Sequence, residues 1–175
     1  MKHFFVMMFL ITSASLYAQQ GKNQFQIAGQ VGFPTGDFAD AVQTGYGGTV
    51  KGLLGLGKNL QGTFMTGYSI YKAKIQANAP SASTNFKSIP LLLGARANLG
   101  DFFIEPQVGW SINTITARAG GASASETQGS FTWNAGIGYK FDNLELGVRY
   151  QYGRLKNSDE NFTYAGVHLG YNFDL

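Results

Sequence analysis

Cysteine is absent from this 175-residue chain, and charged residues are scarce, at 13% of the total. The first absence excludes disulfides and thiolate metal sites, and it is compatible with a location outside the cytoplasm. The formal net charge of +3 comes without a cluster of Lys or Arg in the sequence, which argues against a nucleic-acid partner. Only four prolines occur, so long extended segments are permitted.

A long apolar segment is missing as well. The leader MKHFFVMMFLITSASLYAQQ holds an apolar run from Phe4 to Ile11, which is too short for an anchor helix that crosses about 30 Å of hydrocarbon. Lys2, this run and the small residues before Ala18 have the pattern of a secretory signal peptide. We therefore predict a signal peptide over residues 1–18, cleaved after Ala18, and a single domain over residues 19–175. Since no cysteine follows the leader, a lipoprotein is not expected.

Glycine and aromatic residues are abundant, with 24 Gly and 14% aromatic residues. Apolar and polar side chains alternate with a period of two, as in NLELGVRYQY, where Leu144, Val148 and Tyr150 alternate with Glu145 and Arg149. Such alternation predicts β-strands with one apolar and one polar face. The eight segments with this pattern cover residues 25–33, 44–57, 60–71, 86–99, 102–113, 130–141, 143–152 and 163–175.

The connections between these segments alternate in length. Three are tight turns with Gly, Asp and Asn, at residues 57–59, 100–101 and 142–143. Four are long, at residues 34–43, 72–85, 114–129 and 154–162. Short turns at one end and long loops at the other are typical of outer-membrane barrels, in which the short turns are periplasmic. We predict an all-β fold, an eight-stranded antiparallel up-and-down transmembrane β-barrel.

The composition of the two faces indicates which one is turned to lipid. Eight strands enclose an interior that ordinary side chains just fill, so the many large apolar groups would not fit inside. If the polar faces point inward, glycines leave room for charged groups that can pair with one another. The predicted lumen charges are Lys51, Arg96, Glu105, Lys140, Glu145, Arg149 and His168. The predicted lipid-facing aromatic residues are Phe33, Tyr68, Phe102, Trp110, Trp133, Tyr139, Tyr150, Tyr152, Tyr171 and Phe173.

Three stretches resemble the outer-membrane protein β-barrel domain family, the small OmpA/OmpX-like barrels. They are GQVGFPTGDFAD after the first segment, SIPLLLGARANLG in the fourth and AGVHLGYNFDL at the end. The resemblance covers residues 24–175 and implies an integral outer-membrane protein. The closing strand, with Phe173 and Leu175, is similar to the signal that the barrel-assembly machinery recognises in such proteins.

Catalytic and metal-binding chemistry finds little support. His168 is predicted to point inward, and its neighbours in GVHLG provide no nucleophile. Asp37 and Asp40 could ligate a cation, but Asp37 is better explained as closing the turn after Gly36. We expect no enzymatic activity, no cofactor and no metal site.

Three hypotheses for function remain. The favoured one is a monomeric structural or interaction barrel, surrounded by outer-membrane lipids, whose four long extracellular loops contact an unidentified partner. The second is a narrow channel or small-molecule conduit, for which the lumen charges would form a gate rather than a plug. The third is a soluble secreted lipocalin-like binder with its apolar face inside.

Overall fold

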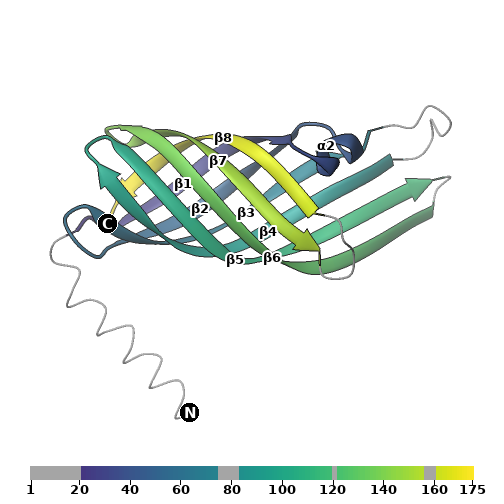
Figure 1. Ribbon diagram of the computed structural model, residues 1–175, viewed down its shortest axis with the longest axis horizontal. Coiled ribbons are helices and arrows are strands. Elements are labelled where there is room, and N and C mark those ends of the chain that lie inside the picture. The colour runs from purple at the N-terminus through teal and green to yellow at the C-terminus, as the bar shows by residue number, and fades with distance from the viewer. Residues whose placement is uncertain (1–20, 75–82, 120–121, 156–160) are drawn as a thin grey trace, which may run out of the picture.

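The protein is a closed, eight-stranded antiparallel barrel in which each strand pairs with its neighbours in the sequence (Figure 1). This computed structural model describes residues 21–74, 83–119, 122–155 and 161–175. The barrel predicted from the alternation is thereby confirmed. The predicted signal peptide lies outside the described residues. Within the described part, no helix is long and apolar enough to cross a membrane.

The strands differ in length, and the longest lie in the middle of the chain. Their bounds are β1 (Gln24–Pro34), β2 (Gly45–Gly55), β3 (Leu60–Lys72), β4 (Ser83–Leu99), β5 (Phe102–Ala119), β6 (Ala122–Phe141), β7 (Leu144–Leu155) and β8 (Asn161–Asp174). One short helix, α2 (Asp37–Ala41), lies between β1 and β2. β1 also pairs with β8, from Gln24 opposite Asp174 to Pro34 opposite Tyr164, and this pairing closes the barrel.

The two ends of the barrel are built differently. At one end, tight turns join β4 to β5 and β6 to β7, and Gly100 and Asp142 adopt positive φ angles of 69° and 54° there. The C-terminus lies at this same end (Figure 1). Because short turns are periplasmic in outer-membrane barrels, the opposite end, which carries α2, is the extracellular mouth.

One of the four predicted long loops is wrong. Residues 114–129 are mostly strand, because β5 and β6 continue their pairing to Ala119 opposite Ala122. β7 pairs with β6 only from Ser130 onward. The end of the β5–β6 hairpin therefore projects beyond β7. The segment after β1 contains α2, with Gly36 at a φ of 58° before it, and no side-chain cap is formed. Asp37 therefore begins a helix rather than closing a turn.

The side chains alternate between a polar interior and an apolar exterior. Along β1, buried Gln26 and Gln30 alternate with exposed Phe25, Ile27 and Val31. A soluble barrel would bury the apolar set, because apolar surface is expelled from water. The observed arrangement is the one that a lipid environment stabilises, since lipid tails solvate the apolar face. The lipocalin-like arrangement is therefore absent.

Candidate functional site: the barrel interior and its mouth

Charged side chains from five strands meet in the periplasmic half of the interior. Arg96 donates from Nη1 and Nη2 to the two carboxylate oxygens of Glu145, at 2.6 and 3.0 Å, and from Nε to Glu105 at 2.5 Å. Lys51 Nζ lies 2.7 Å from Glu105 Oε1 and 4.0 Å from Glu145 Oε1. His168 Nε2 lies 3.1 Å from Glu145 Oε1. We call these five residues the interior network.

The interior network is balanced in charge and almost completely shielded from water. Two carboxylates face two cations, and Arg96 and Glu145 have no measurable exposure. Burial of single charges would be very unfavourable, whereas a bidentate Arg–carboxylate pair with further hydrogen bonds compensates much of the loss of hydration. The arrangement ties β2, β4, β5, β7 and β8 together across the lumen. Its chemical role is therefore to hold opposite walls of the barrel in place.

Two of the seven predicted lumen charges lie elsewhere in the interior. Lys140 Nζ donates to Asn98 Oδ1 at 2.9 Å, nearer the periplasmic turns. Arg149 is buried and donates from Nη1 to the sulfur of Met65 at 2.8 Å. The expectation that either would pair with the carboxylates of the network is not met, because Lys51 and Arg96 occupy those oxygens.

Apolar and small residues shape the space around the network. The guanidinium carbon of Arg96 lies 3.9 Å from the ring centroid of Phe103, a cation–π contact. The buried Leu53 and Leu92, like Phe103, interrupt the polar inner face. A side chain at Gly147 would collide with the imidazole of His168. Because Gly147 has no side chain, the imidazole of His168 has space to reach Glu145.

A second layer, which the sequence analysis missed, closes the extracellular mouth. Phe38 of α2 packs against Phe86 and Tyr71, with ring centroids 5.1 and 5.4 Å apart in edge-to-face geometry. Phe162 lies next to both Phe38 and Phe86. We call this group the mouth cluster; its members are Phe38, Val42, Tyr71, Phe86, Phe162 and Tyr164, all buried. The alternation could have predicted one member of this cluster: Phe86 lies two residues before Ser88, which points inward, so Phe86 is expected to point inward as well.

Backbone hydrogen bonds hold α2 across the mouth on both sides. Thr35 N donates to Thr163 O at 2.9 Å, toward β8. Gln43 N donates to Lys72 O at 2.8 Å, and Lys74 N donates to Ala41 O at 3.0 Å, toward the end of β3. The helix is too short to be stable alone. Its position is therefore fixed by these bonds and by the burial of Phe38.

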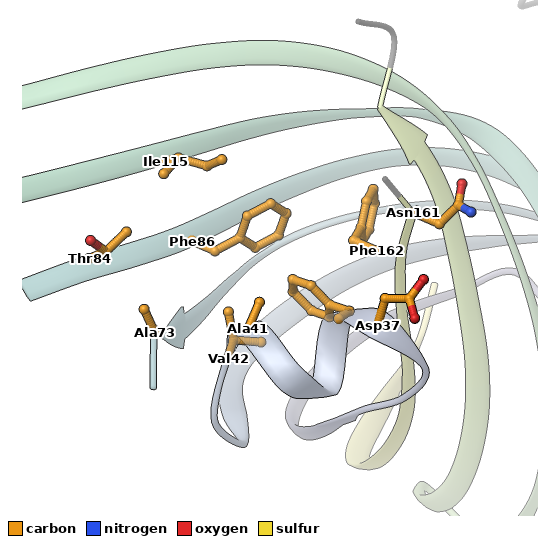
Figure 2. Close-up of a pocket in the computed structure, with 10 residues that line it drawn as sticks. Asp37, Ala41, Val42, Ala73, Thr84, Phe86, Ile115, Asn161 and Phe162 are labelled. Atoms are coloured by element: carbon orange, nitrogen blue, oxygen red, sulfur yellow. The ribbon is translucent and has the colours of Figure 1, made fainter. Parts of the chain in front are cut away.

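A cavity of about 220 Å³, partly open to solvent, lies beside the mouth cluster. Its walls are mostly apolar and include Phe38, Phe86, Ile115 and Phe162. Figure 2 shows Asp37 and Asn161 near Phe162 at one end of this space, whereas Ala73 and Thr84 lie at the other. The cavity thus combines aromatic walls with a polar end.

The predicted lipid-facing aromatic residues lie on the outside of the barrel. Near the periplasmic turns, Phe102 contacts Tyr139 with centroids 4.8 Å apart, and Tyr171 contacts Phe173 at 4.7 Å. Toward the mouth, the ring of Trp133 lies 5.9 Å from Tyr152. The remaining members are also exposed: Phe33, Tyr68, Trp110 and Tyr150. Bands of this kind mark the two interfaces of a membrane.

Metal ligands do not gather within the described residues, where no group of three or more His, Asp or Glu side chains could hold an ion. The carboxylates of the interior network are occupied by cations of the chain itself.

Comparison with solved structures gives the same barrel. Ail, the attachment invasion locus protein of Yersinia pestis, matches with a TM-score of 0.67 and 15% identity, over 89% of this chain and all of that one. Ail has also been solved with the heparin analogue sucrose octasulfate. Neisserial surface protein A matches with a TM-score of 0.56 and 17% identity, over 87% of this chain and 97% of that one.

The N-terminal β-barrel domain of Pseudomonas aeruginosa OprF matches with a TM-score of 0.53 and 20% identity, over 88% of this chain and all of that one. Among curated proteins, none matches the sequence. The family model for the outer membrane protein beta-barrel domain matches residues 4–173. An apolar exterior between two aromatic bands, a polar interior and this match lead to one conclusion: the chain belongs to the outer membrane protein β-barrel domain family and is an outer-membrane protein.

Proposed function

We propose that this protein is a closed, monomeric barrel without enzymatic activity that acts at its extracellular surface. The observation that carries the proposal is that two separate layers fill the lumen. The interior network crosses it with charges that are already paired, and the mouth cluster crosses it again with aromatic rings. An ion would have to displace both layers, so the barrel is better suited to binding than to conduction.

A polyanionic saccharide is the partner that the extracellular end fits best. Lys72, Lys87 and Arg118 come from β3, β4 and β5. Asn85 on β4 is the reference point: Lys72 lies opposite it on β3, and Lys87 follows it by two residues on β4. Arg118 lies opposite Ser83, two residues before Asn85, so the three cations are close together in the sheet. They form what we call the basic patch. The complex of Ail with sucrose octasulfate supports this partner class, because Ail shares the fold.

The proposal also includes how the chain is exported and assembled. A signal peptide over residues 1–18 directs the chain out of the cytoplasm and is removed after Ala18. The barrel-assembly machinery then inserts residues 19–175 into the outer membrane, with β8 as the strand that it recognises.

The closed lumen predicts that the purified protein gives no steady current steps in a planar lipid bilayer. The double variant Arg96→Ser/Arg149→Ser is expected to remain closed as well, because the mouth cluster still crosses the lumen at another level. Both proteins would first be shown to be folded by their faster migration in unboiled gel samples. Reproducible steps from the unaltered protein, or steps that appear only in the double variant, would favour the channel hypothesis.

The basic patch predicts salt-dependent binding of a heparin octasaccharide. The triple variant Lys72→Gln/Lys87→Gln/Arg118→Gln is expected to bind roughly tenfold more weakly, since each exposed charge contributes a fraction of a kcal/mol and salt screens it. Titration calorimetry at two salt concentrations measures this difference. The control is Lys22→Gln/Lys58→Gln, which removes two exposed cations at the periplasmic end. Equal weakening by both variants would show non-specific attraction and contradict the proposed patch.

A further inference from the structure

One buried cation in the lumen has no carboxylate to balance its charge. Among the described residues, the buried charged side chains are two carboxylates, Glu105 and Glu145, and three cations, Lys51, Arg96 and Arg149. The interior network uses both carboxylates for Lys51 and Arg96. With histidine counted as neutral, the buried interior therefore carries one positive charge in excess, and Arg149 is the residue that holds it.

The surroundings of Arg149 do not neutralise its guanidinium. Arg149 is only 5% exposed, and its Nη2 has no hydrogen-bond partner in the described part of the chain. Its Nη1 donates to the sulfur of Met65 at 2.8 Å, but a thioether is a weak and uncharged acceptor. Arginine does not lose its proton in proteins, so the charge remains. A buried charge without a partner is strongly unfavourable, and an ion of opposite sign removes this cost.

The strand register places Arg149 between the two layers that fill the lumen. Arg149 on β7 lies opposite Gly166 on β8. Gly166 in turn lies midway along β8 between Tyr164, a member of the mouth cluster, and His168, a member of the interior network. Arg149 therefore occupies a level of the lumen that both layers separate from the solvent.

The wall beside Arg149 has no side chains to fill it. The residues directly opposite Arg149 are both glycines, Gly136 on β6 and Gly166 on β8. A Cβ atom built at Gly136 would find its nearest neighbour at 3.5 Å, which is an ordinary contact. The two neighbouring strands thus leave space next to this side chain.

Two further unpaired polar groups lie near this level. Thr49 Oγ1 and His168 Nδ1 are buried without a hydrogen-bond partner among the described residues. Met65, which the guanidinium of Arg149 reaches, lies opposite Lys51 on β2, two residues from Thr49. Such diagonal neighbours in a sheet are about 7 to 8 Å apart, so the hydroxyl of Thr49 can donate to the same ion. His168 Nδ1 is an acceptor when Nε2 donates to the interior network, and it suits a water molecule beside the ion.

We propose that the lumen between the interior network and the mouth cluster holds one small monovalent anion, such as chloride, bonded to Arg149 Nη2. One negative charge balances the excess of one cation, whereas a divalent anion would only reverse it. The ion is enclosed as the barrel folds, because a filled layer lies on each side of it. This site is separate from the basic patch on the outside of β3, β4 and β5, and it stabilises the fold rather than conducting.

Bromide in place of chloride makes the ion visible. The full-length mature protein is folded and crystallised in sodium bromide, and anomalous scattering at the bromine absorption edge locates the bound ions. One peak in contact with Arg149 Nη2 is expected in the unaltered protein. No peak is expected there in Arg149→Met, which keeps a long side chain but removes the charge. A missing peak in the unaltered protein, or the same peak in Arg149→Met, would overturn the proposal.

Urea unfolding in lipid vesicles tests whether the ion stabilises the fold. At constant ionic strength, replacing bulky gluconate by chloride is expected to raise the midpoint urea concentration of the unaltered protein, because a ligand that binds only the folded state stabilises it. Gly136→Asp places a carboxylate directly opposite Arg149 and should make the midpoint independent of chloride. The matched control Gly136→Ala, which adds no charge, should keep the dependence. No chloride effect in the unaltered protein, or an equal effect in Gly136→Asp, would refute the site.

Discussion

Arg96→Ala is expected to lower the free energy of unfolding by about 3 to 5 kcal/mol, the loss typical when one member of a buried ion pair is removed. The guanidinium of Arg96 is bonded to both carboxylates of the interior network. Its removal leaves Glu145 with His168, with Asn172 Nδ2 at 3.4 Å and with a distant Lys51 Nζ at 4.0 Å. Urea unfolding of the barrel in lipid vesicles, followed by tryptophan fluorescence, measures the loss.

The matched control for this variant is Arg118→Ala, which removes an exposed arginine from β5. It should change the free energy of unfolding by less than about 0.5 kcal/mol, as is usual for surface positions. The double variant Arg96→Ala/Glu145→Ala should recover part of the loss, because it also removes a carboxylate left without its arginine. Strictly additive losses in the double variant would contradict the idea that the two residues act as a pair.

Val148→Arg is expected to destabilise the barrel by about 2 to 4 kcal/mol, the range for a cation placed on the lipid face at the bilayer midplane. Val148 is 48% exposed and lies opposite Ile137 and Val167, between the two aromatic bands. The guanidinium would have to leave water for hydrocarbon. The same unfolding measurement in vesicles gives the difference.

Leu144→Arg, four residues earlier on β7, is the control for position along the membrane normal. Leu144 is 47% exposed and begins its strand at the periplasmic turn. The substituted side chain can reach the interface there, so a loss of about 0 to 1 kcal/mol is expected. Equal and small losses at both positions would mean that this face of β7 is not turned to lipid.

The strands and their faces could be predicted from the sequence because a period of two is a local signal. Once the strands close into a barrel, parity alone places Lys51, Arg96 and Glu105 inside. Which cation pairs with which carboxylate could not be predicted, since it depends on the stagger of five strands across the lumen. Lys140 has inward parity as well, yet it lies one layer nearer the periplasm and bonds to Asn98.

The mouth was harder to predict because its parts have weak local signals. A helix of five residues such as α2 has no periodicity to detect, and its one anchoring ring, Phe38, lies in a segment rich in turn residues. The extension of β5 and β6 is built from Ala, Ser, Thr and Gly, a composition that is also typical of loops. The basic patch is scattered along the sequence and forms only through the register of three strands.

The bonds that hold α2 also bear on how slowly the folded protein comes apart. β1 and β8 join the two ends of the chain, with Gln24 bonded to Asp174 across 150 residues, so the entropy of closing a long loop opposes this contact. Thr163 donates to Thr35 O at 2.6 Å, and Phe38 packs on Phe162, so the same junction is fastened a second time at its outer end. We therefore expect these contacts to slow unfolding by holding β1 to β8 at the outer end, a kinetic stability separate from the lipid face and the buried charges.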